Sequence, residues 1–260
     1  MKLISSKDNP FYKRLKLLAQ SSHQRRRTGQ TLLEGVHLAD AYLGAVGQPL
    51  ACVVAEPALH DPEVAAIWAR VEDSLRVCLP ETLFEPLSTL VNGVALVFLI
   101  DMPAGHLPKR QTTDCVILDA VQDAGNVGSI LRTAAAAGVR DVFCTSGTAL
   151  CWSSKVLRAG MGAHFMLNIV EHCPADALAP RLGVPLLATS LQAQTSLYGQ
   201  DLRRPVAWVF GNEGAGVSQA WLDRIETPVR IPQPGGMESL NVAACAAICL
   251  FEAVRQRDEA

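Results

Sequence analysis

Short, continuously apolar segments separated by helical segments constrain the fold of the second half of this chain more than any other feature of the sequence. Strands that are apolar at every position, and not only at every second one, are typical of parallel sheets covered on both faces. The helices between these strands cover the faces of the sheet and form the connections between its parallel strands. We therefore predict an α/β fold with a mostly parallel sheet. The predicted strands are Cys115–Leu118, Asp141–Cys144, Pro185–Thr189, Val206–Phe210 and Thr227–Ile231, and helices are predicted to follow Asn126, Ser153 and Ser239.

The first half of the chain also alternates between strands and helices, and a stretch rich in proline, glycine and polar residues follows it. An amphipathic helix is predicted to end near Ala19, with Leu15, Leu17 and Leu18 facing inward. The other predicted elements are strands at Ala51–Ala55 and Val94–Ile100 and a helix at Asp61–Val71. We predict a small α/β domain over residues 1–104, a linker over 105–113 and a second domain over 114–260.

Composition indicates a packed protein without membrane or metal partners. The chain has 260 residues, of which 49% are hydrophobic and 18% are charged, so it can build a sizeable core. Its longest apolar run, Val94–Ile100, is far too short to span a bilayer, and we recognise no secretory signal. The eight cysteines form no Cys-x-x-Cys pair and no Cys/His cluster with zinc spacing. We expect reduced thiols, a cytoplasmic location and no metal.

Positive charge is concentrated at the start of the chain. Met1 to Asp40 holds eight Lys/Arg against three Asp/Glu. A solvated helix face accounts for any one of these charges. Their clustering beside Phe11 and Tyr12, whose rings are of a kind that stack on bases, favours contact with RNA. The predicted RNA-binding residues are Lys13, Arg14, Arg25, Arg26 and Arg27.

Three loops are predicted at the carboxyl ends of the parallel strands, where ligands bind in sheets of this kind. In the first loop Asn126 stands as a helix cap, and Gly128 leaves room beside the first turn. Arg132 has no carboxylate four residues away, so an ion pair within the helix does not account for it. A role in binding an anion would account for Arg132.

The second loop is rich in glycine and directly follows a strand. Gly211, Asn212, Glu213, Gly214 and Gly216 allow close contact between a ligand and the backbone. The loop lacks the Lys-Ser/Thr of a Walker loop and the spacing of a dinucleotide fingerprint. It therefore suits a ligand without a polyphosphate.

The third loop follows the strand that ends at Ile231. It breaks at Pro232 and Pro234, turns on Gly235-Gly236, and carries Glu238, Ser239 and Asn241 at the start of a helix. Because that helix has no polar stripe, we expect it to be buried nearly all round. The turn suits the close approach of a small ligand, although a connection in any α/β domain has a similar composition.

Together the loops resemble the three motifs of the SpoU (TrmH-like) RNA ribose 2′-O-methyltransferases of the SPOUT superfamily. The matching patterns are Asn126-x-Gly128-x-x-x-Arg132, Gly211-Asn-Glu-Gly-x-Gly216, and Ile231-Pro followed by Glu238-Ser-Leu-Asn-Val242. The resemblance covers Asp114 to about Val254, and the start of the chain resembles the family's L30e-like RNA-binding extension. Two positions depart from the pattern: Gln233, where the family usually has Met, and Ala243, where it has a small polar residue.

The resemblance implies an S-adenosylmethionine-dependent homodimer with a deep trefoil knot at the C-terminus of an α/β domain. The implied cofactor-binding residues are Thr189, Gly211, Asn212, Gly216, Ile231 and Leu240, and the implied catalytic residues are Arg132, Asn126, Glu213, Ser239 and Asn241. An arginine stays protonated, so Arg132 would hold a phosphate and stabilise negative charge on the reacting oxygen. Whether the proton of the hydroxyl passes to Arg132, to Glu213 or to water is left open.

We therefore expect methylation of a ribose 2′-hydroxyl in RNA. Ribosomal RNA is favoured over tRNA because of the resemblance at the start of the chain. The alternatives are the same chemistry on tRNA, a catalytically silent RNA-binding relative, and an unrelated α/β enzyme acting on a nucleotide or small molecule. The five implied catalytic residues occur together, which argues against a silent relative, and the basic start of the chain argues against a small-molecule enzyme.

Overall fold

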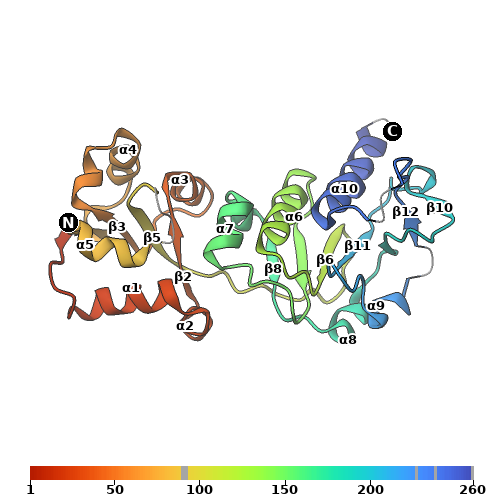
Figure 1. Cartoon of the computed structure of the whole chain (residues 1–260), viewed down its shortest axis with the longest axis horizontal. Coiled ribbons are helices and arrows are strands. Elements are labelled where there is room, and N and C mark those ends of the chain that lie inside the picture. Colours follow the sequence, from red (N-terminus) through yellow and green to blue (C-terminus); the bar gives the residue numbers. More distant parts are fainter. Residues whose placement is uncertain (89–92, 226–227, 237–238, 259–260) are drawn as a thin grey trace. The chain divides into compact units, whose positions relative to one another are not determined.

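The computed structural model describes residues 1–88, 93–225, 228–236 and 239–258, and the chain divides into two compact units (Figure 1). The N-terminal unit comprises Met1–Pro103 and Trp152–Phe165, and the C-terminal unit comprises Ala104–Cys151 and Met166–Ala260. The segment Trp152–Phe165 thus groups with the N-terminal unit, although the predicted second domain includes it. The proposed domain limits of 1–104, 105–113 and 114–260 stay a prediction.

The N-terminal unit is built on a mixed five-stranded sheet. Its strand order is β1-β4-β3-β5-β2, in which β5 runs antiparallel to both β3 and β2 while the other pairs are parallel. The strands are β1 (Lys2–Leu3), β2 (Gln30–Glu34), β3 (Ala51–Ala55), β4 (Arg76–Leu79) and β5 (Leu96–Asp101). The predicted strand at Ala51–Ala55 is confirmed, whereas β5 begins two residues later than predicted and β1 and β4 were not predicted.

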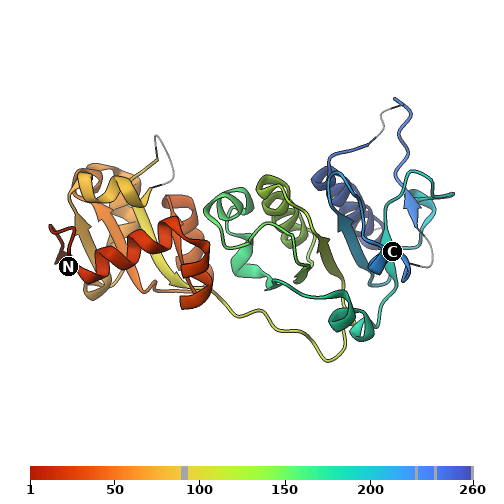
Figure 2. The same ribbon diagram turned by 60° about the horizontal axis from the view of Figure 1, so that its bottom comes forward.

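Helix α1 (Pro10–Gln20) covers one face of this sheet (Figure 2). The Asn9 side chain caps it by accepting from the backbone N–H of Phe11 at 2.9 Å. Leu15 and Leu18 are buried as predicted, but the inward placement of Leu17 is wrong, because this side chain is 51% exposed. A position two residues after Leu15 lies on the far side of a helix with 3.6 residues per turn. The other helices are α2 (Ser22–Thr28), α3 (Val36–Ala45), α4 (Pro62–Arg70), α5 (Glu81–Phe84) and α7 (Ser154–Gly160).

The C-terminal unit contains the predicted parallel sheet. Its order is β8-β7-β6-β11-β9, and every neighbouring pair is parallel. The strands are β6 (Cys115–Asp119), β7 (Asp141–Cys144), β8 (Asn168–Val170), β9 (Leu186–Ala188) and β11 (Ala207–Gly211). A separate parallel pair joins β10 (Thr195–Ser196) to β12 (Val229–Arg230). Four of the five predicted strands lie in the five-stranded sheet with small shifts at their ends. The fifth, predicted at Thr227–Ile231, is β12 and belongs to the separate pair, and Thr227 lies outside the described residues. Strands β8 and β10 were not predicted.

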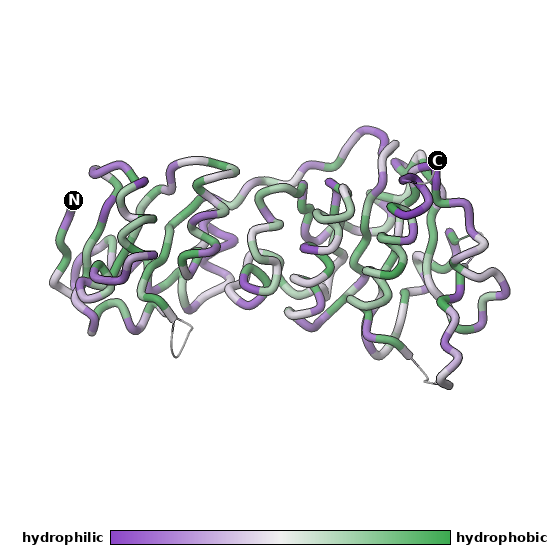
Figure 3. Tube along the Cα trace, turned by 90° about the horizontal axis from the view of Figure 1, so that it is seen from above, coloured by the Kyte–Doolittle hydropathy of each residue, from purple (hydrophilic) through white to green (hydrophobic). Residues whose placement is uncertain are grey.

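Helices cover both faces of the parallel sheet, as its continuously apolar strands require (Figure 1). On one face α6 (Ala124–Ala136) packs beside α10 (Val242–Asp258), which also contacts β11. On the other face α8 (Ala175–Leu178) and α9 (Gln219–Leu222) contribute Leu178 and Trp221 to a core around Ile117 and Val209. Apolar and polar stretches alternate along the trace of each unit (Figure 3).

The predicted linker packs on the C-terminal unit. Gln111 is 2% exposed, its N–H donates to the carbonyl of Arg181 at 2.7 Å, and its carbonyl accepts from Gly183 at 2.8 Å. A Cβ at Gly105 would lie 1.9 Å from the carbonyl oxygen of Ile169, so only glycine fits there. These contacts fix the path by which the chain enters β6.

Two further observations concern the helices and the cysteines. Within the described ranges, no helix is both long and apolar enough to cross a membrane. All eight cysteines are free thiols, and only Cys245 among them is not fully buried. Burial raises the pKa of Cys52 to about 12, so this thiol stays protonated and unreactive at neutral pH.

Candidate active site

The first and second predicted loops follow β6 and β11 and start at one edge of the parallel sheet, whereas the third follows β12, which lies outside this sheet. Gly211, the last residue of β11, lies opposite Asp119, the last residue of β6. Strand β9 pairs with the other side of β11, and Thr189 directly after β9 pairs with Val229 of β12. The structure thus brings the three predicted loops to the carboxyl edge of the sheet, where ligands bind in open parallel sheets.

The first loop ends in a cap that differs from the predicted one. Asp123 is the cap of α6, because its Oδ1 accepts from the backbone N–H of Asn126 at 2.8 Å and the helix begins at Ala124. The prediction that Asn126 caps the helix is wrong. Both Asp and Asn favour cap positions, so the sequence Asp123-Ala-Gly-Asn126 allowed either. The side chain of Asn126 is left available for contacts outside its own helix.

The amide of Asn126 joins the other two loops. Its Nδ2 donates to Glu213 Oε1 at 3.0 Å, and its Oδ1 accepts from Asn241 Nδ2 at 2.9 Å. Asn241 Oδ1 accepts in turn from the backbone N–H groups of Ala243 and Ala244, at 2.9 and 3.2 Å. One chain of hydrogen bonds therefore connects the start of α10 with the first and second loops.

The start of α10 also differs from the prediction. The helix begins at Val242 with Asn241 as its cap, and not at Ser239. Ser239 is exposed, and its hydroxyl makes no hydrogen bond with any described residue. Glu238 lies outside the described residues. The expectation that α10 is buried nearly all round is also wrong for the single chain, because Phe251 is 47% exposed.

Glu213 accepts three hydrogen bonds from the first loop. Besides the Asn126 amide, the donors are the backbone N–H groups of Gln122 at 3.1 Å and Asp123 at 3.2 Å. Burial alone acts to raise the pKa of Glu213, but the hydrogen bonds from Asn126 and from backbone N–H groups outweigh it and lower the pKa. The carboxylate is therefore ionised at neutral pH.

The glycine-rich turn after β11 is held by its own asparagine. Asn212 Oδ1 accepts from two backbone N–H groups of the turn at 2.9 Å each, and its Nδ2 donates to the carbonyl of Ala120 at 2.9 Å. A Cβ at Gly211 would lie 2.3 Å from the carbonyl carbon of Gly216, so the chain itself requires glycine at 211. Asn212 contributes to the site by shaping this turn.

Asp119 is a site residue that sequence reasoning did not single out. It is 5% exposed, its Oδ2 accepts from the backbone N–H of Ser218 at 2.7 Å, and its Oδ1 accepts from Thr145 Oγ1 at 2.9 Å. Thr145 Oγ1 also accepts from the backbone N–H of Ala120 at 3.0 Å. Asp119 thus ties the far end of the glycine-rich turn to the first loop. The available signal was a carboxylate directly after an apolar strand, where a buried charge requires partners.

Two adjoining cavities lie at this edge of the sheet. The main cavity has a volume of about 420 Å³ and the side cavity about 150 Å³, and they share Thr189, Leu191, Ser239, Leu240 and Cys245. The main cavity is also lined by Gly211, Asn212, Glu213, Gly216 and Asn241, and the side cavity by Ser190, Ile231 and Gln233. All six predicted cofactor-binding residues therefore line one cavity or both. Asn126 and Arg132 line neither.

Arg132 lies on the exposed side of α6. Its side chain makes no hydrogen bond or ion pair with any described residue. The exposed residues on the same side of the helix are small, so they leave the guanidinium open to solvent. They are Gly125, Ser129 and Ala136. The structure thus presents an unpaired cation on the helix whose first turn carries Asn126.

The predicted RNA-binding cations of the N-terminal unit have different environments. Lys13 pairs with Asp8 at 3.0 Å, and Arg14 donates to the Gln30 side chain. Arg25 donates to the carbonyl of Leu18 at 2.7 Å at the end of α1, and burial lowers its pKa. Arg26 and Arg27 are exposed and make no side-chain contact of this kind with the described residues.

The prediction that Tyr12 stacks on bases is wrong. Tyr12 is 4% exposed and packs in the core of the N-terminal unit with Leu15 and Leu18. Phe11 is only partly buried, and Lys2 Nζ lies 5.9 Å from the centre of its ring. A ring in the core is closed to bases, so the RNA hypothesis for this segment now rests mainly on its exposed cations.

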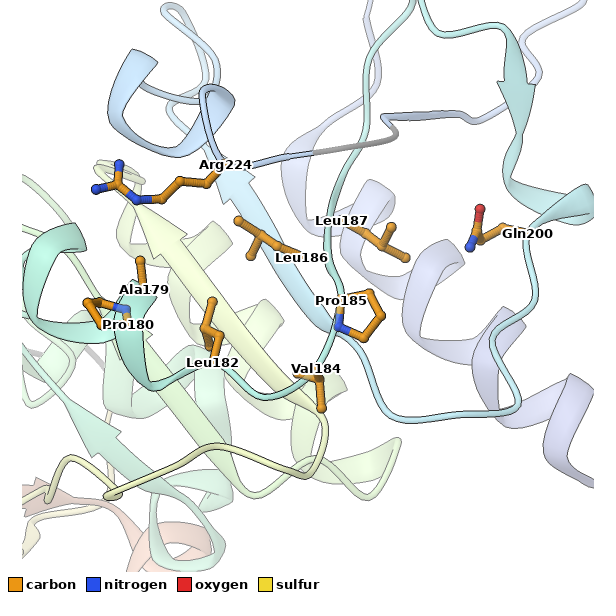
Figure 4. Close-up of a pocket in the computed structure, with 9 residues that line it drawn as sticks. All are labelled: Ala179, Pro180, Leu182, Val184, Pro185, Leu186, Leu187, Gln200 and Arg224. Carbon is orange, nitrogen blue, oxygen red and sulfur yellow. The ribbon is translucent and has the colours of Figure 1, made fainter.

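A larger cavity of about 660 Å³ lies beside the residues that lead into β9 and the first two residues of that strand (Figure 4). Its walls come from residues 179–187, with Gln200 and Arg224 bordering it, and Arg224 pairs with Asp176 at 2.8 Å. None of the predicted site residues lines it. It lies beside the residues that lead into β9, away from the edge where the three loops meet, so we assign no catalytic role to it.

The fold and the site define a class of RNA-modifying enzyme, and comparison with known proteins gives the family. The profile described as the SpoU rRNA Methylase family matches residues 114–251. The chain is 35% identical to an uncharacterized tRNA/rRNA methyltransferase of Synechocystis sp., covering 98% of this chain and 94% of that protein. It is 32% identical to the 23S rRNA (guanosine(2553)-2′-O)-methyltransferase RlmP of Bacillus subtilis, covering 96% of this chain and 98% of that protein.

Solved structures agree with this result. The AdoMet-bound rRNA methyltransferase from Sinorhizobium meliloti has a TM-score of 0.82 and 30% identity, covering 98% of this chain and 97% of that chain. The chain therefore belongs to the SpoU rRNA methylase family.

Proposed function

We propose that this chain transfers the methyl group of S-adenosylmethionine to a ribose 2′-hydroxyl of ribosomal RNA. The hydrogen-bond chain from Asn241 through Asn126 to Glu213 carries the proposal, because it joins three loops beside a cavity at the carboxyl edge of a parallel sheet. RlmP, which is named as a 23S rRNA methyltransferase, matches both halves of the chain. That match favours ribosomal RNA over tRNA.

The residues around the two cavities fit S-adenosylmethionine. This cofactor has a flat heterocycle at one end and a charged amino acid at the other, so it needs both apolar and polar walls. Leu240 and Ile231 supply apolar surface, and Glu213 and Asn241 line the main cavity. The bound cofactor would supply a methyl group already activated by its sulfonium. The residues that would hold it are Thr189, Gly211, Asn212, Gly216, Ile231 and Leu240.

Glu213 acts as a positioning residue in this proposal and not as the proton acceptor. A general base works best when its pKa lies near the working pH and a lone pair faces the substrate. Glu213 has a lowered pKa, and three donors already occupy its carboxylate. Its role is to orient the Asn126 amide and to hold the glycine-rich turn against the first loop.

Arg132 binds RNA in this proposal. Its guanidinium carries N–H donors on all three nitrogens and has no carboxylate partner among the described residues. A phosphate next to the target ribose would supply the missing partner, and the positive charge would stabilise negative charge on the 2′-oxygen as the methyl bond forms. Ser239, whose hydroxyl makes no hydrogen bond with the described residues, shapes the wall that the two cavities share.

We also propose the assembly that the family resemblance implies: a homodimer with a deep trefoil knot in the C-terminal unit and an L30e-like RNA-binding N-terminal unit. The apolar surface of the first part of α10 supports a dimer, because Ala244 and Phe251 are exposed there and residues 242–251 include no charged side chain. Free cysteines and an RNA substrate support a cytoplasmic location. Light scattering that reports a monomer at micromolar concentration would contradict the dimer.

Labelled S-adenosylmethionine tests the proposed reaction. The protein is incubated with separate rRNA and tRNA pools, and ribose methylation is then mapped. Methyl transfer to rRNA supports the proposal, and transfer to tRNA alone would move the activity to that substrate. Calorimetry without RNA tests the silent-relative alternative, because a protein that binds RNA but not the cofactor cannot be the enzyme. Methylation of free nucleosides would favour a small-molecule enzyme.

A further inference from the structure

The amide of Gln233 has an atom that the fold leaves without a partner. Gln233 follows β12, and although the residue as a whole is only half-buried, its Oε1 is fully buried and accepts no hydrogen bond from any described residue. Buried polar atoms in native proteins are nearly always paired, so an exception calls for an explanation such as a missing ligand. Gln233 lines the side cavity, so a ligand there could supply the missing donor.

The two cavities differ in the charge of their walls. The side cavity is lined by Leu191, Ile231 and Leu240, with hydroxyl, thiol and amide groups, and none of the described residues that line it is charged. The main cavity includes the ionised carboxylate of Glu213. An elongated ligand with one uncharged aromatic end and one zwitterionic end would therefore place its aromatic end in the side cavity, where desolvating a charge would be costly.

We propose that Gln233 recognises the adenine of the methyl donor, with Oε1 accepting a hydrogen bond from the exocyclic amine. The inference rests on the proposed function, because it assumes that S-adenosylmethionine is the ligand. Adenine is flat and apolar on its faces, which suits the leucine and isoleucine walls, and its amine is a donor at the ring edge. The ammonium of the same cofactor belongs in the main cavity, where Glu213 provides negative charge.

This contact belongs to this chain in particular. The family usually has Met after Ile-Pro, and a thioether accepts hydrogen bonds only weakly. Gln233→Met therefore restores a residue of similar length that the surrounding fold accommodates in relatives. The substitution removes the amide and should leave the backbone unchanged.

The test compares two ligands by calorimetry, without RNA and without turnover. One is S-adenosylhomocysteine, and the other is its inosine counterpart, in which a carbonyl oxygen replaces the exocyclic amine. The wild-type protein should prefer the adenine ligand, and Gln233→Met should reduce this preference by about tenfold, since one buried hydrogen bond is involved. A smaller fraction of folded protein in a variant would affect the measurements with both ligands equally, so it cancels in the ratio of the two affinities.

Two further variants control the measurement. Gln192→Met makes the same substitution at an exposed glutamine near the same wall, whose Oε1 already accepts from Ser190 Oγ at 2.9 Å. It should keep the wild-type preference. Gln233→Glu keeps an acceptor at the same position, so it should also favour adenine over hypoxanthine, even if the buried charge weakens both ligands. A 180° rotation of the Gln233 amide exchanges its oxygen and its nitrogen. Because a carboxylate has only acceptor oxygens, Gln233→Glu distinguishes an accepting oxygen from a donating nitrogen.

The outcomes separate this inference from the proposed function. Failure of the wild-type protein to bind S-adenosylhomocysteine and S-adenosylmethionine would remove the proposed function itself. Binding with an unchanged adenine preference in Gln233→Met would overturn the inference and leave the function standing. Equal weakening of both ligands in Gln233→Met, or loss of the preference in Gln233→Glu, would also overturn it, since neither fits an oxygen that accepts from the amine.

Discussion

The basic segment of the N-terminal unit and the loops around the main cavity both contain predicted functional residues, but the fold uses them in different ways. In the basic segment the contacts are mostly local, as when Lys13 pairs with Asp8 or Arg25 caps the preceding helix. Around the cavity, Asn126 binds side chains 87 and 115 positions away in the sequence. Local contacts leave each cation independent of the others, whereas distant ones make the loops depend on each other. We therefore expect small additive effects in the first region and large coupled effects in the second.

The largest effect is expected at Arg132. Arg132→Ala should lower methyl transfer at least about a hundredfold, as loss of a group that stabilises charge in a transition state does. Affinity for S-adenosylmethionine should change little, because Arg132 lines neither cavity. Arg140→Ala is the control, since Arg140 is also an exposed arginine but lies after α6, next to the amino end of β7. Near-normal turnover of Arg132→Ala would remove this residue from the proposed mechanism.

The coupling between loops can be measured with Asn126 and Asn241. Each single substitution to Ala removes one hydrogen-bonded amide, and the double variant removes both. If the two amides act as one unit, the effects on cofactor affinity will not add, and the coupling should be about 1 kcal/mol or more. Calorimetry on the four proteins gives this value. Additive losses would mean that the loops are independent and would remove the difference between the two regions.

Substitution of Asp119 tests whether a residue outside the three motifs maintains the shape of the main cavity. Asp119→Asn weakens the acceptor for the Ser218 N–H, so it should loosen the glycine-rich turn and lower affinity for S-adenosylmethionine by roughly tenfold. Asp141→Asn is the matched control. Asp141 also accepts two side-chain hydrogen bonds, from Gln111 and Asn168, but it lies at the amino end of β7. It should lower thermal stability without changing cofactor affinity, and equal affinity losses in both variants would contradict the role given to Asp119.

Strands could be predicted from the sequence where successive residues of a segment are all buried and apolar. Strand β7 is close to such a case, because residues 142–144 form a short, buried apolar run between helices. Strands β8 and β10 contain three and two residues, which is too short for a period to be visible. The direction of single side chains was harder to predict. Leu17 and Tyr12 were misplaced because a helix face is fixed by what packs on it, and that partner lies elsewhere in the chain.

The site could be predicted as a set of residues but not as a set of contacts. Residues of the second and third motifs line the cavities, whereas Asn126 and Arg132 of the first motif do not. The sequence does not show that Asn126 binds Asn241 or that Glu213 binds the first loop. These contacts depend on strand order, which places the ends of β6 and β11 side by side. Asp119 escaped notice for the same reason, since its partners lie 26 and 99 positions away.

A smaller effect is expected on cofactor binding at acidic pH, where Glu213 becomes protonated. Because its pKa is lowered in the folded protein, the stability that the ionised carboxylate contributes is present above its ordinary pKa and is lost as pH falls through the lowered value. Cofactor binding should therefore stay constant from neutral pH down to about pH 5 and fall only below about pH 4. In Glu213→Gln the acidic decline should weaken, as titration calorimetry across this range would show. A decline in turnover near pH 6 that disappears in Glu213→Gln would instead make Glu213 the proton acceptor.

The smallest effect is expected from the exposed cations of the basic segment, and it should be additive. Arg26→Ala and Arg27→Ala should each weaken RNA binding a few-fold and reduce the dependence of log affinity on log salt concentration by about 0.7 to 0.9, the contribution of one phosphate contact. Arg25→Ala should act differently, because Arg25 donates to carbonyls at the end of α1. This variant should lower thermal stability more than it changes the salt dependence of RNA binding. Filter binding over a range of salt concentrations, with thermal unfolding of the same variants, separates the two effects. An unchanged salt slope in the Arg26/Arg27 double variant would place the RNA elsewhere on the protein, whereas a slope change larger than the sum of the single variants would show that this segment is coupled as the cavity loops are.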